Sequence, residues 1–157
     1  MDLSTIKVFE QKLELHREMP MKVVKKELHF STKGEIDLVD ITREVELFVA
    51  ESGISKGQVL IFVPGATGAV VAIEHEEGLL EDFKKILKEI VPKEKPYLHN
   101  RFDDNAHSHI RATLLGPSLV FPIVDGELVR GTWQQIFFVE LDTRPRKRRI
   151  LLQAIGE

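Results

Sequence analysis

SLVFPIVDGELV, residues 118–129, is the stretch of sequence that decides the fold. Two apolar runs flank Asp125-Gly126, a residue pair typical of two-residue hairpin turns because both turn positions need a positive φ angle. The pattern predicts a β-hairpin made of Ser118–Val124 and Glu127–Val129.

Strand-like segments lie on both sides of this hairpin. Residues 58–64 form a continuous apolar run between Gly57 and Pro64-Gly65, which is typical of a strand buried on both faces. The later strands follow one another through short turns, so a mainly antiparallel sheet is expected. The other expected strands are Met21–Ser31, Ala69–Glu74, His107–Leu115, Gln134–Asp142 and Arg149–Ala154.

Two further segments have the apolar spacing of helices. One begins after Asp40, a suitable N-cap residue, and ends at Gly53; the other extends from Glu77 to Val91, before Pro92. With 157 residues the chain has the length of a single domain. We therefore expect one α+β domain over residues 1–157, a sandwich-like antiparallel sheet with about two main helices packed on one side.

Composition limits the possible partners and the location. A net charge of −3 argues against nucleic-acid binding, and no apolar run approaches the roughly 20 residues of a membrane helix. No secretory signal is visible at the N-terminus and there are 0 cysteines, so a cytoplasmic location is expected and any metal must use His, Asp or Glu ligands. The basic run Arg144–Arg149 favours a solvated loop, with phosphate attraction as the alternative.

Residues 97–111 concentrate the side chains best suited to chemistry. They include His99, Asp104, His107, His109 and Arg111. If residues 107–115 form a strand, His107 and His109 share one face, with Cα atoms about 6–7 Å apart. The pair then fits a divalent metal site with His99 or Asp104 as a third ligand, an acid/base or anion-binding site, or simply a polar strand face. The two arginines of the segment, Arg101 and Arg111, favour phosphate recognition.

Three other segments are weaker candidates. Glu74 follows an expected buried strand, where ligands often bind, whereas the next acidic residues suit a helix N-terminus. The loop Pro64–Ala69 can expose backbone N–H groups to an anion, but it lacks the lysine of a P-loop, so no nucleotide cofactor is indicated and an ordinary connection is the alternative. Thr132, Trp133 and Gln134 fit a pocket wall or subunit interface, with a core Trp as the alternative.

These motifs, in this order, resemble the YjbQ-like family. The segment SLVFPIVDGELVRGTWQQI, residues 118–136, is similar to its signature stretch, and HNRFDDNAHSHIRATLL, residues 99–115, to its His/Asp segment. With residues 65–83 added, the match covers most of the chain from about residue 58. Many members have His-Thr-Thr-Ala where this chain has Gly65–Gly68, and Asn where it has Ile73.

The resemblance implies a homotrimer with a pocket near a subunit boundary and a thiamine-phosphate synthase activity, which joins a pyrimidine pyrophosphate to a thiazole phosphate. On this reading Glu74, Asp104, His107 and His109 are catalytic, and Arg111, Thr132, Trp133 and Gln134 bind substrate. His99, His107 and His109 would hold a divalent metal, Zn or Mg. The alternative is a non-catalytic protein that binds a metal or a small phosphorylated ligand.

Overall fold

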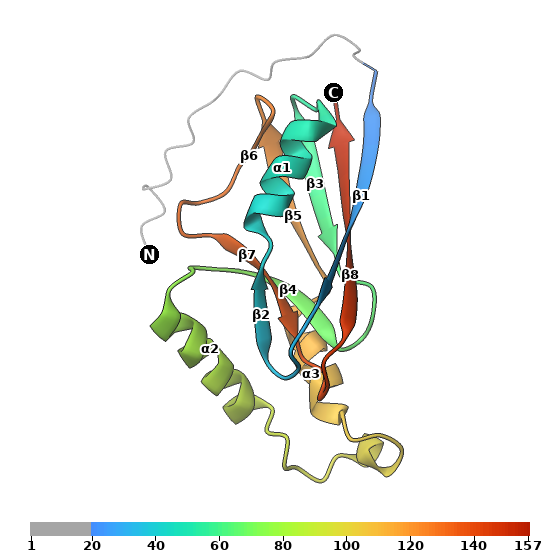
Figure 1. The fold of residues 1–157 in the computed structure, drawn as a ribbon, viewed down its shortest axis with the longest axis vertical. Helices are drawn as coiled ribbons and strands as arrows, with labels where there is room; N and C mark the ends of the chain where they lie inside the picture. The colour runs from blue at the N-terminus through green and yellow to red at the C-terminus, as the bar shows by residue number, and fades with distance from the viewer. Residues whose placement is uncertain (1–19) are drawn as a thin grey trace, which may run out of the picture.

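The computed structural model describes residues 20–157, so residues 1–19 of the predicted domain lie outside the described part of the chain (Figure 1). Strand order is β1-β8-β3-β5-β6 in a five-stranded sheet, sheet A, and β2-β7-β4 in a three-stranded sheet, sheet B. The elements are β1 (Lys22–Ser31), β2 (Asp37–Asp40), α1 (Thr42–Ser52), β3 (Gly57–Phe62), β4 (Gly68–Ile73), α2 (Glu77–Ile90), the 3-10 helix η1 (Leu98–Arg101), α3 (Ala106–Leu115), β5 (Ser118–Val124), β6 (Glu127–Leu128), β7 (Gln135–Glu140) and β8 (Lys147–Gly156).

The predicted hairpin is confirmed as β5 and β6. Ile123 pairs with Leu128 and Val124 with Glu127, and the two residues between the strands, Asp125 and Gly126, have φ angles of 53° and 81°. All strand pairs in both sheets are antiparallel. The turn therefore pairs β5 with β6, and in the strand order β6 lies at one edge of sheet A.

The main core lies between sheet A and α1. Alternate residues of β8, namely Ile150, Leu152 and Ala154, are buried, as the two-residue repeat of a strand requires. They pack in one cluster with Val45 and Phe48 of α1. The helix predicted after Asp40 is thus confirmed, and it begins at Thr42.

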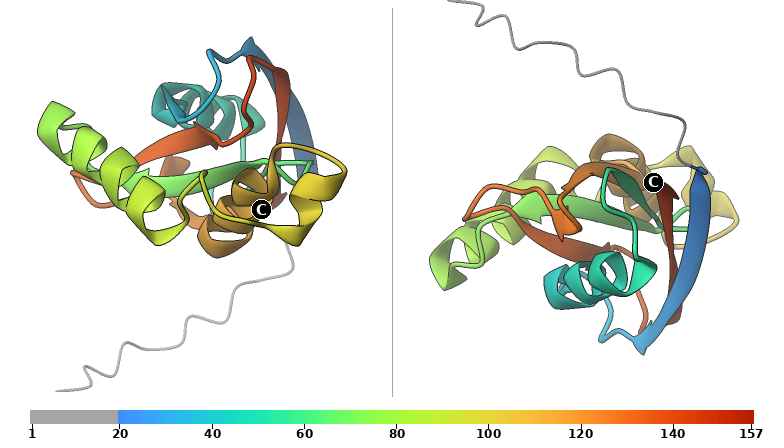
Figure 2. Two further views of the ribbon diagram at one scale, coloured as in Figure 1. Left: turned by 90° about the horizontal axis from the view of Figure 1, so that it is seen from below. Right: turned by 90° about the horizontal axis from the view of Figure 1, so that it is seen from above.

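Sheet B is covered on both faces. Val70 and Phe138 face the main core, whereas Ala69 and Val139 form a second cluster with Leu87 of α2 and, from α3, Ala112. Viewed along the long axis, β4 and β7 lie between α1 and α3 (Figure 2). The fold class is confirmed as α+β with two antiparallel sheets, but the helices cover both faces of sheet B and not one side only.

The segment His107–Leu115 was the main error in the secondary-structure prediction, because it forms helix α3 and not a strand. β3 also differs from expectation: Val59 and Ile61 are buried, while Leu60 and Phe62 on its other face are half-buried. The short strand β2 was not predicted. No helix in residues 20–157 has the length and apolar character needed to cross a bilayer.

Candidate functional site

Helix α3 carries the histidines predicted to form the site. Its buried positions include 107, 108, 111 and 112, which recur with the spacing of one helical face. Two residues along an α-helix correspond to a rotation of about 200° about its axis, so side chains at positions i and i+2 point to nearly opposite sides. The prediction that His107 and His109 share one strand face is therefore wrong: His107 points into the protein, and His109 is partly exposed.

A buried polar cluster occupies the inner face of α3. His107 has 0% exposure, and its Nε2 lies 3.4 Å from Glu35 Oε1. Arg111, also fully buried, donates to Glu35 through Nη1 and to the Val91 carbonyl through Nε and Nη2, at 3.0 and 2.7 Å. Arg111 is thus used inside the protein and does not reach the outer surface of α3. Among the described residues, both ring nitrogens of His107 and the hydroxyl of Ser108 lack a hydrogen-bond partner.

Protonation in this cluster follows from burial and charge. Burial lowers the pKa of His107 below its usual 6.5, although the Glu35 carboxylate opposes that shift. Burial alone would raise the pKa of Glu35, but the hydrogen bond and charge of Arg111 outweigh it, so the pKa of Glu35 is lowered. The cluster is therefore held together by an ionised Glu35 and Arg111 beside a neutral imidazole.

The outer face of α3 forms a different site, which we call the imidazole pocket: His99, His109 and the loop Gly65–Gly68. The two rings meet edge to face with centroids 5.0 Å apart, and His99 Nε2 lies 3.2 Å from Asn105 Oδ1. An open cavity of about 340 Å³ adjoins His109. It is lined by Gly65, Ala66, Gly68, His109, Ala112, Thr113 and Pro117.

The loop Gly65–Gly68 includes the position at which the family resemblance led us to expect histidine. Gly65 has a φ angle of 124°, which favours glycine. Within residues 20–157, neither the Gly65 N–H nor the Ala66 N–H donates a hydrogen bond. The cavity wall thus offers small side chains and backbone donors where a further imidazole was expected from the family pattern.

A carboxylate–arginine network behind this loop was missed by sequence reasoning. Glu140, buried in β7, accepts hydrogen bonds from Arg148, and Arg148 Nη2 also donates to Thr67 Oγ1 at 2.9 Å. Arg146 Nε donates to Asp142 at 2.7 Å. Glu140 and Asp142 stand at the end of an otherwise apolar run that begins at Ile136, and this pattern could have revealed the network. Part of the basic run is therefore neutralised inside the protein, and from Lys147 onward it belongs to β8.

Asp104 lies near the imidazole pocket in sequence but is oriented toward solvent. Its Oδ1 accepts from the Thr143 hydroxyl at 3.4 Å, and its Oδ2 lies 3.7 Å from Arg144 Nη2. This exposed carboxylate pairs with the turn before β8. The structure does not join it to His107.

The remaining predicted residues gather at the far end of β4, in what we call the tryptophan cluster: Glu74, His75, Thr132, Trp133 and Gln134. Gln135 connects its two segments, because its Oε1 accepts from the His75 N–H at 3.0 Å and its Nε2 donates to the Thr132 carbonyl at 2.9 Å. The alternative that Trp133 is a core residue is wrong, since it is 67% exposed. Six residues of strand, roughly 20 Å at ~3.3 Å each, separate Gly68 in the imidazole pocket from Glu74.

The predicted metal ligands are only partly brought together. His99 and His109 are adjacent, whereas His107 lies on the opposite side of α3. Across the part of the chain that is described, no three His, Cys, Asp or Glu side chains are grouped so that they could hold a metal ion. Residues 20–157 of one copy therefore do not group the three or four protein ligands that a zinc site uses.

The two antiparallel sheets and the histidine-bearing helix place the chain among small α+β proteins. Residues 26–157 match the model of the family described as UPF0047 protein YjbQ-like. The chain belongs to this family.

Relatives from archaea and bacteria support this membership. A UPF0047 protein of Archaeoglobus fulgidus is 43% identical over 82% of this chain and 99% of its own length. UPF0047 protein YugU of Bacillus subtilis is 33% identical, over 83% and 98%.

Solved structures agree with the fold. A YbjQ-like protein of unknown function from Sulfolobus solfataricus P2 is 48% identical, with a TM-score of 0.86 over 88% of this chain and 100% of that one. A hypothetical protein from Aeropyrum pernix K1 is 36% identical, with a TM-score of 0.81 over 85% and 99%.

Proposed function

We propose that this protein is a thiamine-phosphate synthase-like transferase that joins a pyrimidine pyrophosphate to a thiazole phosphate. The observation that carries the proposal is the imidazole pocket, where paired His99 and His109 rings adjoin an open cavity walled by the Gly65–Ala66 backbone. Imidazole N–H groups and backbone N–H groups are the donors that phosphate oxygens accept from. The pocket therefore fits the phosphorylated end of a small molecule.

In the proposed reaction, the bond between the pyrimidine methylene and pyrophosphate breaks, and the thiazole nitrogen forms a new bond to that methylene. Negative charge grows on the departing pyrophosphate, so hydrogen-bond donors aimed at it lower the barrier. His109, partly exposed and within the cavity wall, is the side chain we assign to this role. Mg²⁺ would arrive bound to the pyrophosphate, because it needs few protein ligands.

We further propose that a homotrimer completes the site. The tryptophan cluster lies roughly 20 Å from the imidazole pocket within one chain, too far for one small substrate to touch both. A second copy can bring its own tryptophan cluster to the imidazole pocket of the first. Exposed apolar side chains on α2, α3 and β5 favour contacts between copies, since monomers rarely leave large apolar patches uncovered. They are Ile86 and Ile90 of α2, Leu114 of α3 and Val120 of β5.

Incubation of both precursors with Mg²⁺, followed by mass spectrometry of the products, tests the reaction. The wild-type protein should form thiamine phosphate, and His109→Ala should lower the rate by about 10²–10⁴-fold, the usual contribution of an acid/base group. His29→Ala is the control, because His29 is an exposed histidine on β1 that belongs neither to the imidazole pocket nor to the tryptophan cluster. Equal rates for His109→Ala and wild type would remove His109 from the reaction.

A non-catalytic ligand-binding protein is the second candidate. Gly65 favours it, because glycine leaves the pocket without the histidine that many family members have there. Under this alternative, calorimetry would detect binding of both precursors to the wild-type protein, while no product would form at any Mg²⁺ concentration.

A further inference from the structure

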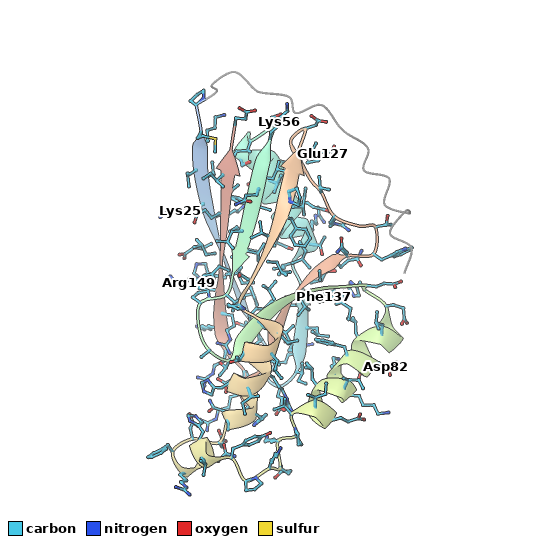
Figure 3. The ribbon with its side chains drawn as sticks, turned by 180° about the vertical axis from the view of Figure 1, so that it is seen from behind. Lys25, Lys56, Asp82, Glu127, Phe137 and Arg149 are labelled. Carbon is cyan, nitrogen blue, oxygen red and sulfur yellow. The ribbon has the colours of Figure 1, made fainter. Side chains whose placement is uncertain are left out.

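His75, in the tryptophan cluster, is held in one orientation by its neighbours. Its Nδ1 lies 2.8 Å from Asp40 Oδ2, and its ring meets Phe137 edge to face with centroids 5.0 Å apart. Its backbone N–H donates to Gln135 Oε1. The side chain is nevertheless 56% exposed, so the rest of the ring faces solvent. These contacts hold His75 against β7 of sheet B, where Figure 3 labels Phe137.

Asp40 determines which nitrogen of His75 carries the proton. Asp40 Oδ1 accepts from the Thr42 N–H at 2.9 Å and from the Thr42 hydroxyl at 2.6 Å. Partial burial opposes ionisation of Asp40, but these hydrogen bonds and that of His75 outweigh it and lower its pKa. An ionised Asp40 can only accept, so Nδ1 of His75 carries the hydrogen, and in the neutral form of the ring Nε2 presents a lone pair outward.

The charge around His75 selects against phosphate. Glu74, Glu76 and Glu77 surround it in sequence, and Glu76 is fixed at the start of α2 by accepting from Gly78 N at 2.8 Å and Leu79 N at 2.7 Å. Carboxylates repel phosphate oxygens and attract amino or cationic groups. Arg130, whose Nη1 donates to the Thr132 carbonyl at 3.4 Å, is itself paired with Glu46, so the carboxylates give the tryptophan cluster the opposite preference to the imidazole pocket.

An exposed aromatic ring lies next to this acidic region. Trp133 follows Thr132, whose carbonyl is tied through Gln135 to the His75 backbone. An indole face attracts cationic and electron-poor heterocycles, and a large exposed Trp is common where a flat ligand stacks.

We propose that the tryptophan cluster binds an amine-bearing heterocycle, which stacks on Trp133 and donates a hydrogen bond from its amino group to His75 Nε2. This inference rests on the proposed function and sets the orientation of its substrate: the ring of the aminopyrimidine lies in the tryptophan cluster, and its pyrophosphate lies in the imidazole pocket of a neighbouring copy. Asp40 is a positioning residue, since it acts by holding the His75 ring.

Quenching of tryptophan fluorescence tests the proposal without any need for turnover. Trp133 is the only tryptophan in the sequence, so the signal reports on this site alone. The probe is a hydroxymethyl aminopyrimidine without phosphate, compared with an analogue in which methyl replaces the amino group. In the wild-type protein the amino compound should quench Trp133 and bind at least about 10-fold more tightly than the methyl analogue, a difference typical of one hydrogen bond made in a partly dry site.

His75→Phe should bind both compounds with equal, weak affinity, because the phenyl ring keeps the contact with Phe137 but accepts no hydrogen bond. His29→Phe is the matched control and should behave as wild type. His29 lies opposite Arg149 in sheet A, and both residues pair with Glu27. Figure 3 shows Arg149 well separated from Phe137, which His75 contacts.

Three results would overturn the inference: no quenching by the amino compound, equal wild-type affinity for the two analogues, or displacement of the amino compound by inorganic pyrophosphate. The comparison of two ligands on the wild-type protein stands even if His75→Phe does not fold. If the amino compound binds as expected but no thiamine phosphate is ever formed, the transferase proposal fails and this site remains. If product forms at equal rates in wild type and His75→Phe, the site fails and the transferase remains.

Discussion

His107 shows how one buried side chain connects the fold to pH. The ring is fully buried, its pKa is lowered mainly by that burial, and it lies beside the Glu35–Arg111 pair. The unfolded chain binds a proton on this histidine near pH 6.5, before the folded chain does. Stability linked to His107 is therefore complete above pH 6.5 and is lost as the pH falls from 6.5 through the lower folded pKa.

Urea unfolding at several pH values between 7.5 and 5.5 checks this expectation. The wild-type free energy of unfolding should decrease across that range, and His107→Gln should flatten the decrease because it removes the titrating group. His29→Gln, at an exposed histidine, should retain the wild-type slope. An unchanged slope in His107→Gln would show that protonation of His107 is not linked to folding.

At the level of single residues, the sequence identified the right segment but not the direction of its side chains. Residues 97–111 were selected for their density of His, Asp and Arg, and His99 and His109 do meet there. Glu35 and Val91, the partners of Arg111, lie 76 and 20 residues away along the chain. Contacts at such separations depend on tertiary packing, which side-chain chemistry alone does not reveal.

Arg111 joins three elements by one guanidinium group. It lies on α3, donates to Glu35 in the connection between β1 and β2, and donates to the Val91 carbonyl after α2. Loss of this side chain leaves the largely buried Glu35 carboxylate without its main partner. It also removes the hydrogen bonds that join α3 to the Val91 carbonyl.

Arg111→Met should therefore lower the free energy of unfolding by about 3–5 kcal/mol, the range for breaking a buried ion pair. Arg130→Met is the matched control, because Arg130 pairs with the exposed Glu46 at 2.7 Å and such a pair contributes about 0–1 kcal/mol. Chemical denaturation of both variants measures the difference. A loss below about 1 kcal/mol in Arg111→Met would mean that Glu35 is accommodated without the arginine.

Elements with strong local signals were predicted well, and elements with mixed signals were not. The Asp125-Gly126 turn correctly predicted the β5–β6 hairpin. The apolar stripe correctly predicted α2, which was expected over residues 77–91 and is observed over Glu77–Ile90. In α3, the alternation His-Ser-His-Ile-Arg imitates a strand over five residues, although burial follows the helical period. The four-residue strand β2 pairs with β7 and is too short to show a detectable pattern in the sequence.

At the scale of the whole molecule, the two halves of the candidate site lie at opposite ends of β4. A shared site between copies is thus the arrangement under which both halves touch one substrate. Light scattering should give a mass near three times the 17.9 kDa of one chain. A monomer in solution would leave the imidazole pocket and the tryptophan cluster permanently apart.

Mixed oligomers test this shared site most directly. His109→Ala disables the imidazole pocket and His75→Phe the tryptophan cluster, so each variant alone should form much less thiamine phosphate than the wild-type protein. When equal amounts are unfolded and refolded together, a random trimer should recover about one quarter of wild-type activity, because one boundary in four pairs an intact pocket with an intact cluster. Separately refolded variants, mixed afterwards, are the control and should stay inactive. If the co-refolded mixture also shows no recovery while co-refolded wild type is active, the two halves do not meet across a subunit boundary.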